Sequence, residues 1–201
     1  EPTLAAPIFP EEAQLHYQAD DKMQSNIVLG FPAITMDHPD KFPMIVANKI
    51  LSGASGRLFQ ELRDKQSLAY SVSGSRAEGW RDPGYYLVYI GCEPSKTETA
   101  IAGVKAELQK LIDEPVSDEE LQRAQDYLAG AFVVSLQSFG SQSQTLGFSE
   151  RYGLGYRNYL EYVDNVRAVT KEDIQRIAQT YFTLDNYVLS VVGPQAITNE
   201  T

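Results

Sequence analysis

Arg63 and Tyr70 are the two polar side chains on which we place the function of this sequence. They lie in the stretch LSGASGRLFQELRDKQSLAYSV, residues 51–72, which predicts a loop, a short helix and a strand in that order. A guanidinium and a phenol hydroxyl are both hydrogen-bond donors. The residue types alone also allow a purely structural role. Arg63 could lie on the solvent-exposed face of the helix beside Glu61 and Asp64, and Tyr70 could be one more strand aromatic among 12 tyrosines.

The short helix and the strand are expected to hold this pair in register, with a turn around residues 65–67 between them. Three apolar residues mark one side of the helix: Leu58, Phe59 and Leu62. Alternation with small and polar neighbours places three residues on one face of the strand: Leu68, Tyr70 and Val72.

The sequence lacks a set of residues that could bind a zinc ion. The 2 histidines are His16, in a predicted strand, and His38, just before a predicted helix. Neither has a second histidine or a glutamate at ligand spacing on one helix face. We therefore predict no metal site in this chain, with His16 an ordinary strand residue and His38 a loop or cap residue. The single Cys92 is expected to be a small buried residue at a strand end.

Serine hydrolysis and phosphate binding also lack their motifs. The run Gly53-Ala54-Ser55-Gly56 contains neither a G-x-S-x-G elbow nor a G-K-[ST] ending. No histidine stands where it would serve as a base for a serine. A loop at a helix terminus is the prediction for this run.

The composition predicts a globular protein, and its acidic balance fits a basic partner better than an acidic one, although such a balance more often serves solubility alone. A length of 201 residues with 43% hydrophobic residues can build a core, and the net charge of −10 argues against general nucleic-acid and anionic-membrane binding. No apolar run approaches the length of a membrane span, so we expect a soluble chain. Residues 1–12, with three prolines, predict a linker or trimmed start, and residues 13–201 a single domain that is a fragment of a longer protein.

The apolar patterns predict an α+β fold in which helices pack on one face of a mainly antiparallel sheet. Residues 15–31 predict one long strand or a hairpin, and residues 39–52 a helix. The strand that begins at Leu68 is expected to pair with residues 85–90, which carry large residues on both faces and so lie inside the sheet. Helix starts of the capping-box type are predicted at three pairs: Ser95 with Glu98, Ser117 with Glu120, and Thr170 with Asp173. Shorter helices are predicted at 141–152 and 159–166, and a last strand at 187–192.

The run GRLFQELRDKQSLAYSV, followed in order by DPGYYLVYIGCEPSKTETAI, VSDEELQRAQDYLAGAF, ERYGLGYRNY, VRAVTKEDIQRIAQTYF and VVGP, resembles the C-terminal domain of the M16 zinc peptidases. This family includes insulinase, pitrilysin and the mitochondrial processing peptidase, and the resemblance covers about Leu15 to Pro194. It implies a LuxS/MPP-like metallohydrolase fold.

The resemblance also implies a role for this domain. In the family an N-terminal domain holds catalytic zinc through an inverted H-x-x-E-H helix, and a second domain of the same fold has lost those ligands. The helix at residues 39–52, which contains HPDKFPMIVANK, stands where the zinc motif would be and lacks it. The family element L-R-x-x-x-x-L-x-Y reaches toward the partner's zinc, and its arginine and tyrosine match Arg63 and Tyr70. These residues are then expected to contact substrate and to stabilise the oxyanion of the tetrahedral intermediate. Ser67 stands where the family often has glycine.

The implied function is that of the substrate-binding and active-site-completing half of a zinc metalloendopeptidase, inactive by itself. Zinc is expected in a partner N-terminal domain, on the same chain or on a partner subunit, and the substrate is a peptide or unfolded polypeptide enclosed between the two domains. A dimer is possible in this scheme, and the compartment is expected to be the cytoplasm or periplasm of a prokaryote. The alternative is a non-catalytic scaffold or partner subunit of an M16-like complex.

Overall fold

A computed structural model describes residues 8–80 and 82–194 of the chain. Residues 1–7 of the expected linker lie outside the described residues. The elements follow in this order: β1 (Gln14–Ala19), β2 (Ser25–Pro32), α1 (Lys41–Leu51), η1 (Phe59–Lys65), β3 (Ala69–Ala77), β4 (Tyr85–Cys92), η2 (Pro94–Lys96), α2 (Thr97–Asp113), α3 (Asp118–Ser135), α4 (Phe139–Arg151), η3 (Tyr156–Glu161), α5 (Tyr162–Ala168), α6 (Lys171–Tyr181) and β5 (Val188–Gly193).

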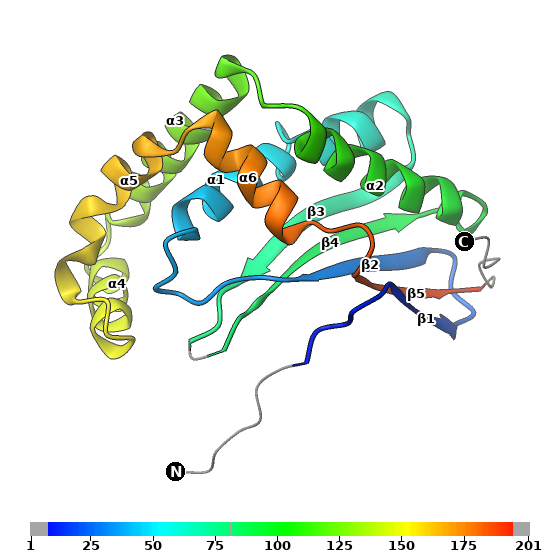
Figure 1. The fold of residues 1–201 in the computed structure, drawn as a ribbon, viewed down its shortest axis with the longest axis horizontal. Helices are drawn as coiled ribbons and strands as arrows, with labels where there is room; N and C mark the ends of the chain where they lie inside the picture. The colour runs from blue at the N-terminus through cyan, green and yellow to red at the C-terminus, as the bar shows by residue number, and fades with distance from the viewer. Residues whose placement is uncertain (1–7, 81, 195–201) are drawn as a thin grey trace, which may run out of the picture.

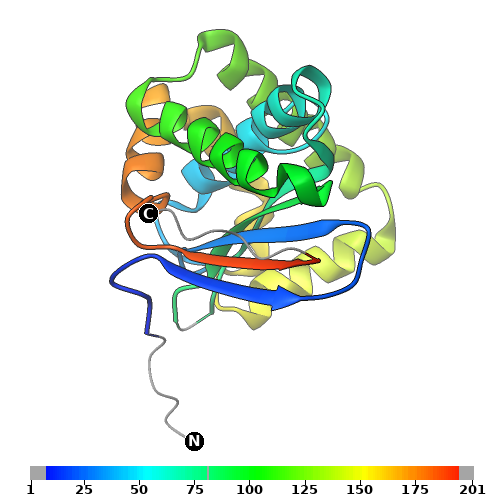
Figure 2. The same ribbon diagram turned by 90° about the vertical axis from the view of Figure 1, so that its right-hand side faces the viewer.

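The five strands form one sheet in the order β1-β5-β2-β4-β3. α1, α2, α3 and α6 lie on one side of this sheet, above it in Figure 1 and again in the view turned by 90° in Figure 2, whereas α4 lies at the left end of Figure 1. Every neighbouring pair is antiparallel except β1 with β5, which is parallel. The predicted α+β layering and mainly antiparallel sheet are thus confirmed, as is the interior position of β4 between β2 and β3.

The prediction of one long strand or a hairpin over residues 15–31 is wrong. β1 and β2 do not pair with each other, because β5 from the far end of the chain lies between them. Ile27 in β2 faces Val191 in β5, and Leu15 in β1 faces Leu189. The pairing depends on a strand more than 150 positions away, which local alternation cannot reveal.

Alternation along the strands sends one set of side chains into the core beneath the helices. In β2 every second residue is buried, and Ile27 and Leu29 are fully so. The helices complete the core with fully buried residues from α1, α2 and α6: Met44, Val46, Val104, Leu108, Ile174 and Ile177. Each such side chain contributes roughly 1.5–3 kcal/mol through burial.

Two of the three predicted capping boxes are present. Ser117 and Glu120 begin α3, and Thr170 and Asp173 begin α6, each with both reciprocal hydrogen bonds. The box at Ser95 and Glu98 is wrong: Pro94–Lys96 form a 3₁₀ turn, and α2 starts at Thr97 without a side-chain cap. The Thr97 hydroxyl contacts Ser25 Oγ at 2.8 Å and the Pro94 carbonyl at 2.9 Å, so this junction is tied to β2 instead.

None of the described helices is long and apolar enough to cross a membrane.

Candidate functional site

Two buried leucines fix the ends of the segment that carries Arg63 and Tyr70. Leu62 is fully buried in η1, and Leu68 is almost fully buried just before β3. The amide of Leu68 donates a hydrogen bond of 2.8 Å to the Leu62 carbonyl, which closes the turn between them. Leu62 also packs closely on α2, since a Cβ on Gly103 would lie 2.7 Å from Leu62 Cδ2. The positions next to these anchors are therefore set by core packing.

The short helix η1 is a π-helix rather than an ordinary α-helix turn. Its wider turn brings the amide of Gln66 to the carbonyl of Glu61, five residues earlier, at 3.2 Å, while the amide of Ser67 donates to the Arg63 carbonyl at 3.1 Å with the ordinary α-helical spacing. Ser67 has φ +52°, and it is the sole non-glycine with positive φ among the described residues. A left-handed conformation costs a side-chain-bearing residue roughly 1 kcal/mol. Glycine therefore suits this position better than serine, because the backbone of Ser67 is strained in this conformation.

Arg63 projects from η1 into solvent. Its guanidinium carbon lies 4.7 Å from the ring centroid of Phe59, one turn earlier on the same helix. An arginine held over an aromatic face keeps its hydrogen-bond donors free while its orientation is restrained. The side chain is thus partly ordered and open to a ligand.

Tyr70 is the extra residue of a β-bulge at the start of β3. Ala69 faces Cys92 of β4 and Ser71 faces Gly91, so Tyr70 has no partner across the ladder. The prediction that Tyr70 shares a face with Leu68 and Val72 is wrong, because the bulge breaks the alternation. Val72 is buried, whereas Tyr70 is 61% exposed. The bulge turns the tyrosine out of the sheet.

Arg63 and Tyr70 therefore both face solvent near one corner of the molecule, on either side of the turn at Ser67. In the described part of the chain no hydrogen bond or ring contact joins them to each other. What they offer is two hydrogen-bond donors, a cation and a hydroxyl, beside the outer edge of β3, which ends the sheet.

The loop that leads into η1 is tied to α3 by a bidentate ion pair. Arg57 Nε donates to Glu120 Oε1 at 2.7 Å, and Arg57 Nη2 donates to Oε2 at 2.9 Å. Hydrogen bonding from Arg57 lowers the pKa of the Glu120 carboxyl. From the sequence we predict Glu120 as part of the cap of α3 and no role for Arg57. The opposite charges of the two residues are the only hint of an ion pair, because 63 positions separate them in the chain.

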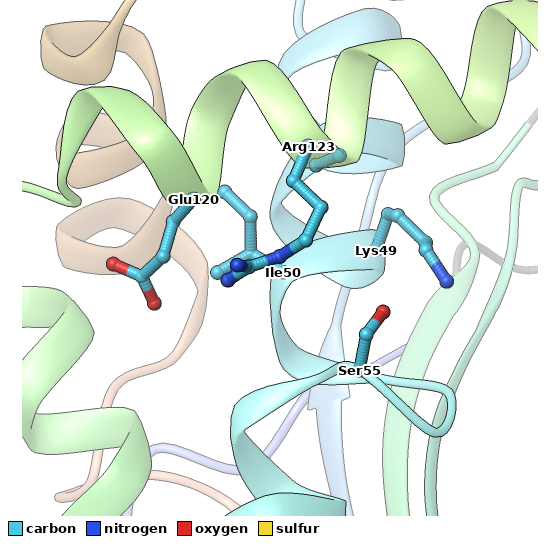
Figure 3. Close-up of a pocket in the computed structure, with 6 residues that line it drawn as sticks. Lys49, Ile50, Ser55, Glu120 and Arg123 are labelled. Atoms are coloured by element: carbon cyan, nitrogen blue, oxygen red, sulfur yellow. The ribbon is translucent and has the colours of Figure 1, made fainter.

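A shallow pocket lies beside this ion pair, between the end of α1, the loop before η1 and α3 (Figure 3). Lys49 and Ser55 point toward the same space, while the carboxylate of Glu120 points away from them. Lys49 Nζ lies 3.5 Å from the ring centroid of Tyr127. With a volume of ≈ 10 Å³ the pocket holds about one water-sized group, so it is no site for a peptide.

A serine that the sequence analysis passed over joins α1 to the middle of β3. Ser52 Oγ accepts from the amide of Gly74 at 2.6 Å and donates to its carbonyl at 3.1 Å. A Cβ on Gly74 would lie 2.6 Å from this oxygen, so only glycine permits the approach. Ser52 thus helps to position the strand that begins with Tyr70.

The remaining candidates behave as ordinary residues. His16 lies in β1, and His38 lies in the loop before α1, where its Nδ1 accepts from the amide of Asp40 at 3.1 Å. Cys92 is fully buried at the end of β4, as predicted, and burial raises the pKa of its thiol. Within residues 8–80 and 82–194 no three His, Cys, Asp or Glu side chains lie close enough together to hold a metal ion.

Comparison with known proteins gives one consistent family. A family model described as "Peptidase M16 inactive domain" matches residues 2–128 of this chain. An uncharacterized zinc protease of Streptomyces coelicolor is 32% identical over 172 residues, which is 85% of this chain and 37% of the relative. An uncharacterized zinc protease of Bacillus subtilis is 28% identical, over 85% of this chain and 42% of the relative. The chain thus spans about two fifths of the length of these relatives.

Solved structures share the fold. A peptidase M16 inactive domain from Pseudomonas fluorescens superposes with a TM-score of 0.88 at 20% identity, over 99% of this chain and 47% of that chain. An inactive peptidase domain from Bordetella parapertussis has a TM-score of 0.74 at 24% identity, over 87% of this chain and 94% of that one. The match covers almost the whole of the Bordetella parapertussis chain, so that structure is of a single domain like this one.

Proposed function

This chain belongs to the peptidase M16 family as its inactive domain, and we propose that it completes the active site of a zinc metalloendopeptidase. Residues 13–201 form the inactive, C-terminal-type domain in this proposal, and residues 1–12 lead into it. A second, zinc-bearing domain of the same fold supplies the metal, either on the same polypeptide or on a partner subunit. The protein-level activity, the peptide substrate and the pairing are all part of the proposal.

The observation that supports it best is the outward placement of Arg63 and Tyr70 by buried neighbours. Leu62 and Leu68 are in the core, yet the residues beside them turn their polar groups to solvent. The β-bulge at Tyr70 is a feature that often re-aims a side chain next to an active site. With 61% of its surface exposed, Tyr70 is accessible to a substrate.

Peptide hydrolysis places negative charge on the carbonyl oxygen of the bond that is cut. Zinc held in a partner domain would supply a Lewis acid for that oxygen. Arg63 and Tyr70 would bind and orient the substrate carbonyl, and their donors would meet the charge as it develops. A preorganised donor of this kind is worth roughly 3 kcal/mol, because it strengthens as the charge forms.

The substrate in this proposal is an extended peptide. β3 is the last strand of the sheet, so it has an outer edge that an added strand can pair with, except at Gly74, whose amide and carbonyl are bonded to Ser52. Main-chain pairing there would place a peptide alongside Tyr70 at the start of β3. Recognition by main-chain groups reads extended shape more than side-chain sequence.

The test compares three preparations: the complete protein, this chain mixed with the zinc-bearing half, and this chain alone. Zinc content is measured by atomic emission, and cleavage is measured with a quenched fluorescent peptide library. We expect cleavage and about one zinc per pair in the first two preparations and neither in the third. Zinc without cleavage in the complete protein would instead make this domain part of a scaffold.

A further inference from the structure

The helices between Tyr127 and Leu160 form an exposed, largely apolar surface whose charged residues, Glu150, Arg151 and Arg157, lie only toward its C-terminal end. This surface, here called the apolar arm, comprises the C-terminal half of α3, α4 and η3. Its exposed large residues are Tyr127, Val133, Val134, Phe139, Phe148, Tyr156 and Leu160, with Phe139 89% exposed. In Figure 1 α4 lies at the left end of the molecule, outside the layer formed by α2 and α6.

The sequence of the apolar arm changes character in the middle of α3. Residues 127–149 contain no Asp, Glu, Lys, Arg or His, although 22% charged residues in the chain would place about five in a stretch of 23. The first half of the same helix carries Asp118, Glu119, Glu120, Arg123 and Asp126. Exposed helices that lack charge and present aromatic rings have the composition of an interface centre.

A cavity in the apolar arm has the size of one side chain. It has a volume of ≈ 190 Å³ and is lined by Leu136, Gln142, Thr145, Leu146 and Tyr159. A pocket for a small-molecule ligand is larger, at about 300–1,000 Å³. A cavity of this size between helices is suited to a single anchoring residue of a protein partner.

The charge of the apolar arm argues against a lipid surface as the occupant. Helices that lie on a membrane carry an excess of Lys and Arg on their polar face. In α4 and η3 the two arginines, Arg151 and Arg157, are balanced by Glu150 and Glu161, and the other polar residues of α4 are serine, glutamine and threonine. The occupant is therefore a protein with a matching apolar surface.

We propose that the apolar arm is the docking surface for the zinc-bearing half of this protein. The curated relatives extend well beyond the matched region, which is 37% and 42% of their length. The apolar arm and Tyr70 lie toward opposite ends of β3, since Trp80, just past the end of that strand, packs on Tyr152 at the end of α4 with ring centroids 5.6 Å apart. A partner that covers both the apolar arm and Tyr70 therefore spans about 30 Å, the length of this nine-residue strand. Its contact with Tyr70 rests on the proposed function, whereas its contact with the apolar arm does not.

Photo-crosslinking in the complete protein tests this. Phe139 and, as the matched control, Met23 are each replaced by a benzophenone amino acid; Met23 is 93% exposed on the loop between β1 and β2. We expect crosslinks from position 139 to peptides of the zinc-bearing half, at a yield at least tenfold above position 23. Mixed isotope labelling separates crosslinks within one molecule from those to a second copy.

A charge placed in the apolar arm gives a second test. A Cβ on Gly147 meets no atom within 4 Å, so a side chain fits there without disturbing the fold. Gly147→Arg should lower the crosslink yield from position 139 about tenfold, and Gly147→Ala should leave it unchanged. Crosslinks only to a second copy, no crosslinks above position 23, or an unchanged yield in Gly147→Arg would each overturn the proposal. The readout needs no cleavage, so an inactive complete protein that still crosslinks would overturn the proposed function alone.

Discussion

The guanidinium of Arg57 donates two parallel hydrogen bonds to the carboxylate of Glu120, at 2.7 and 2.9 Å. The same carboxylate accepts from the amide of Ser117 at 3.1 Å and so caps α3. One acid therefore joins the start of α3 to the loop that leads into η1 and Arg63. Both side chains are mostly buried, with 18% and 22% of their surfaces exposed, which makes the pair stronger than a surface ion pair.

Arg57→Met should lower the free energy of unfolding by about 1–3 kcal/mol, because Glu120 would remain partly buried without its partner. Urea denaturation followed by circular dichroism measures the loss. Lys65→Met is the control, since Lys65 pairs with Glu61 at 2.5 Å on the exposed side of η1 and should change stability by less than about 0.5 kcal/mol. Equal losses in the two variants would contradict a special role for Arg57.

The same pair predicts a dependence of stability on pH. Arg57 lowers the pKa of Glu120 in the folded state below the unfolded value of about 4.3. The stabilisation is therefore complete above that unfolded value and is lost as the pH falls through the lowered folded value. Between pH 6 and pH 3 the parent chain should lose more stability than Arg57→Met does. Parallel curves for the two proteins would show that the pair does not contribute.

Ser67→Gly should stabilise the chain by up to about 0.5 kcal/mol. Glycine removes the strain of φ +52° at roughly 1 kcal/mol, and its greater freedom when unfolded offsets only part of that gain. Thermal unfolding by calorimetry measures the change. Ser75→Gly in the extended strand β3 is the control and should destabilise instead. A loss of stability in Ser67→Gly would mean that the serine side chain makes a contribution of its own.

Gln125→Leu should lower the free energy of unfolding by about 2–4 kcal/mol. The two N–H groups of the buried Gln125 Nε2 are shared among the carbonyls of Val166, Arg167 and Val169, at 3.0–3.2 Å, and so complete the end of α5. Leucine fills the volume but leaves those acceptors without a donor. Gln122→Leu, one turn earlier and exposed, should cost less than about 0.5 kcal/mol in the same denaturation experiment.

Tyr70→Phe should lower kcat of the complete protein by about a hundredfold while its zinc content stays unchanged, because one donor to the transition state is lost. Stability should hardly change, since the side chain is 61% exposed. Tyr85→Phe serves as control, with a tyrosine that is 54% exposed and lies outside the site. An unchanged kcat in Tyr70→Phe would remove Tyr70 from the proposed machinery.

The sequence by itself determined those features that depend on near neighbours. The capping boxes at Ser117 and Thr170, the interior strand β4 and the buried Cys92 follow from local pattern, because helix caps and strand alternation are set within a few residues. It also singled out Arg63 and Tyr70 and, through resemblance, the family. Their catalytic role is still a prediction.

Only the tertiary structure decided the features that join distant parts of the chain. β5 enters between β1 and β2, and Arg57 meets Glu120, through contacts that no local period encodes. The bulge at Tyr70 is decided by the register of β3 against β4, and a shift of one residue there moves a side chain from one face to the other. The charge-free run from 127 to 149 could be read in the sequence, but its meaning depended on finding those helices exposed, since the same residues in a core would need no partner.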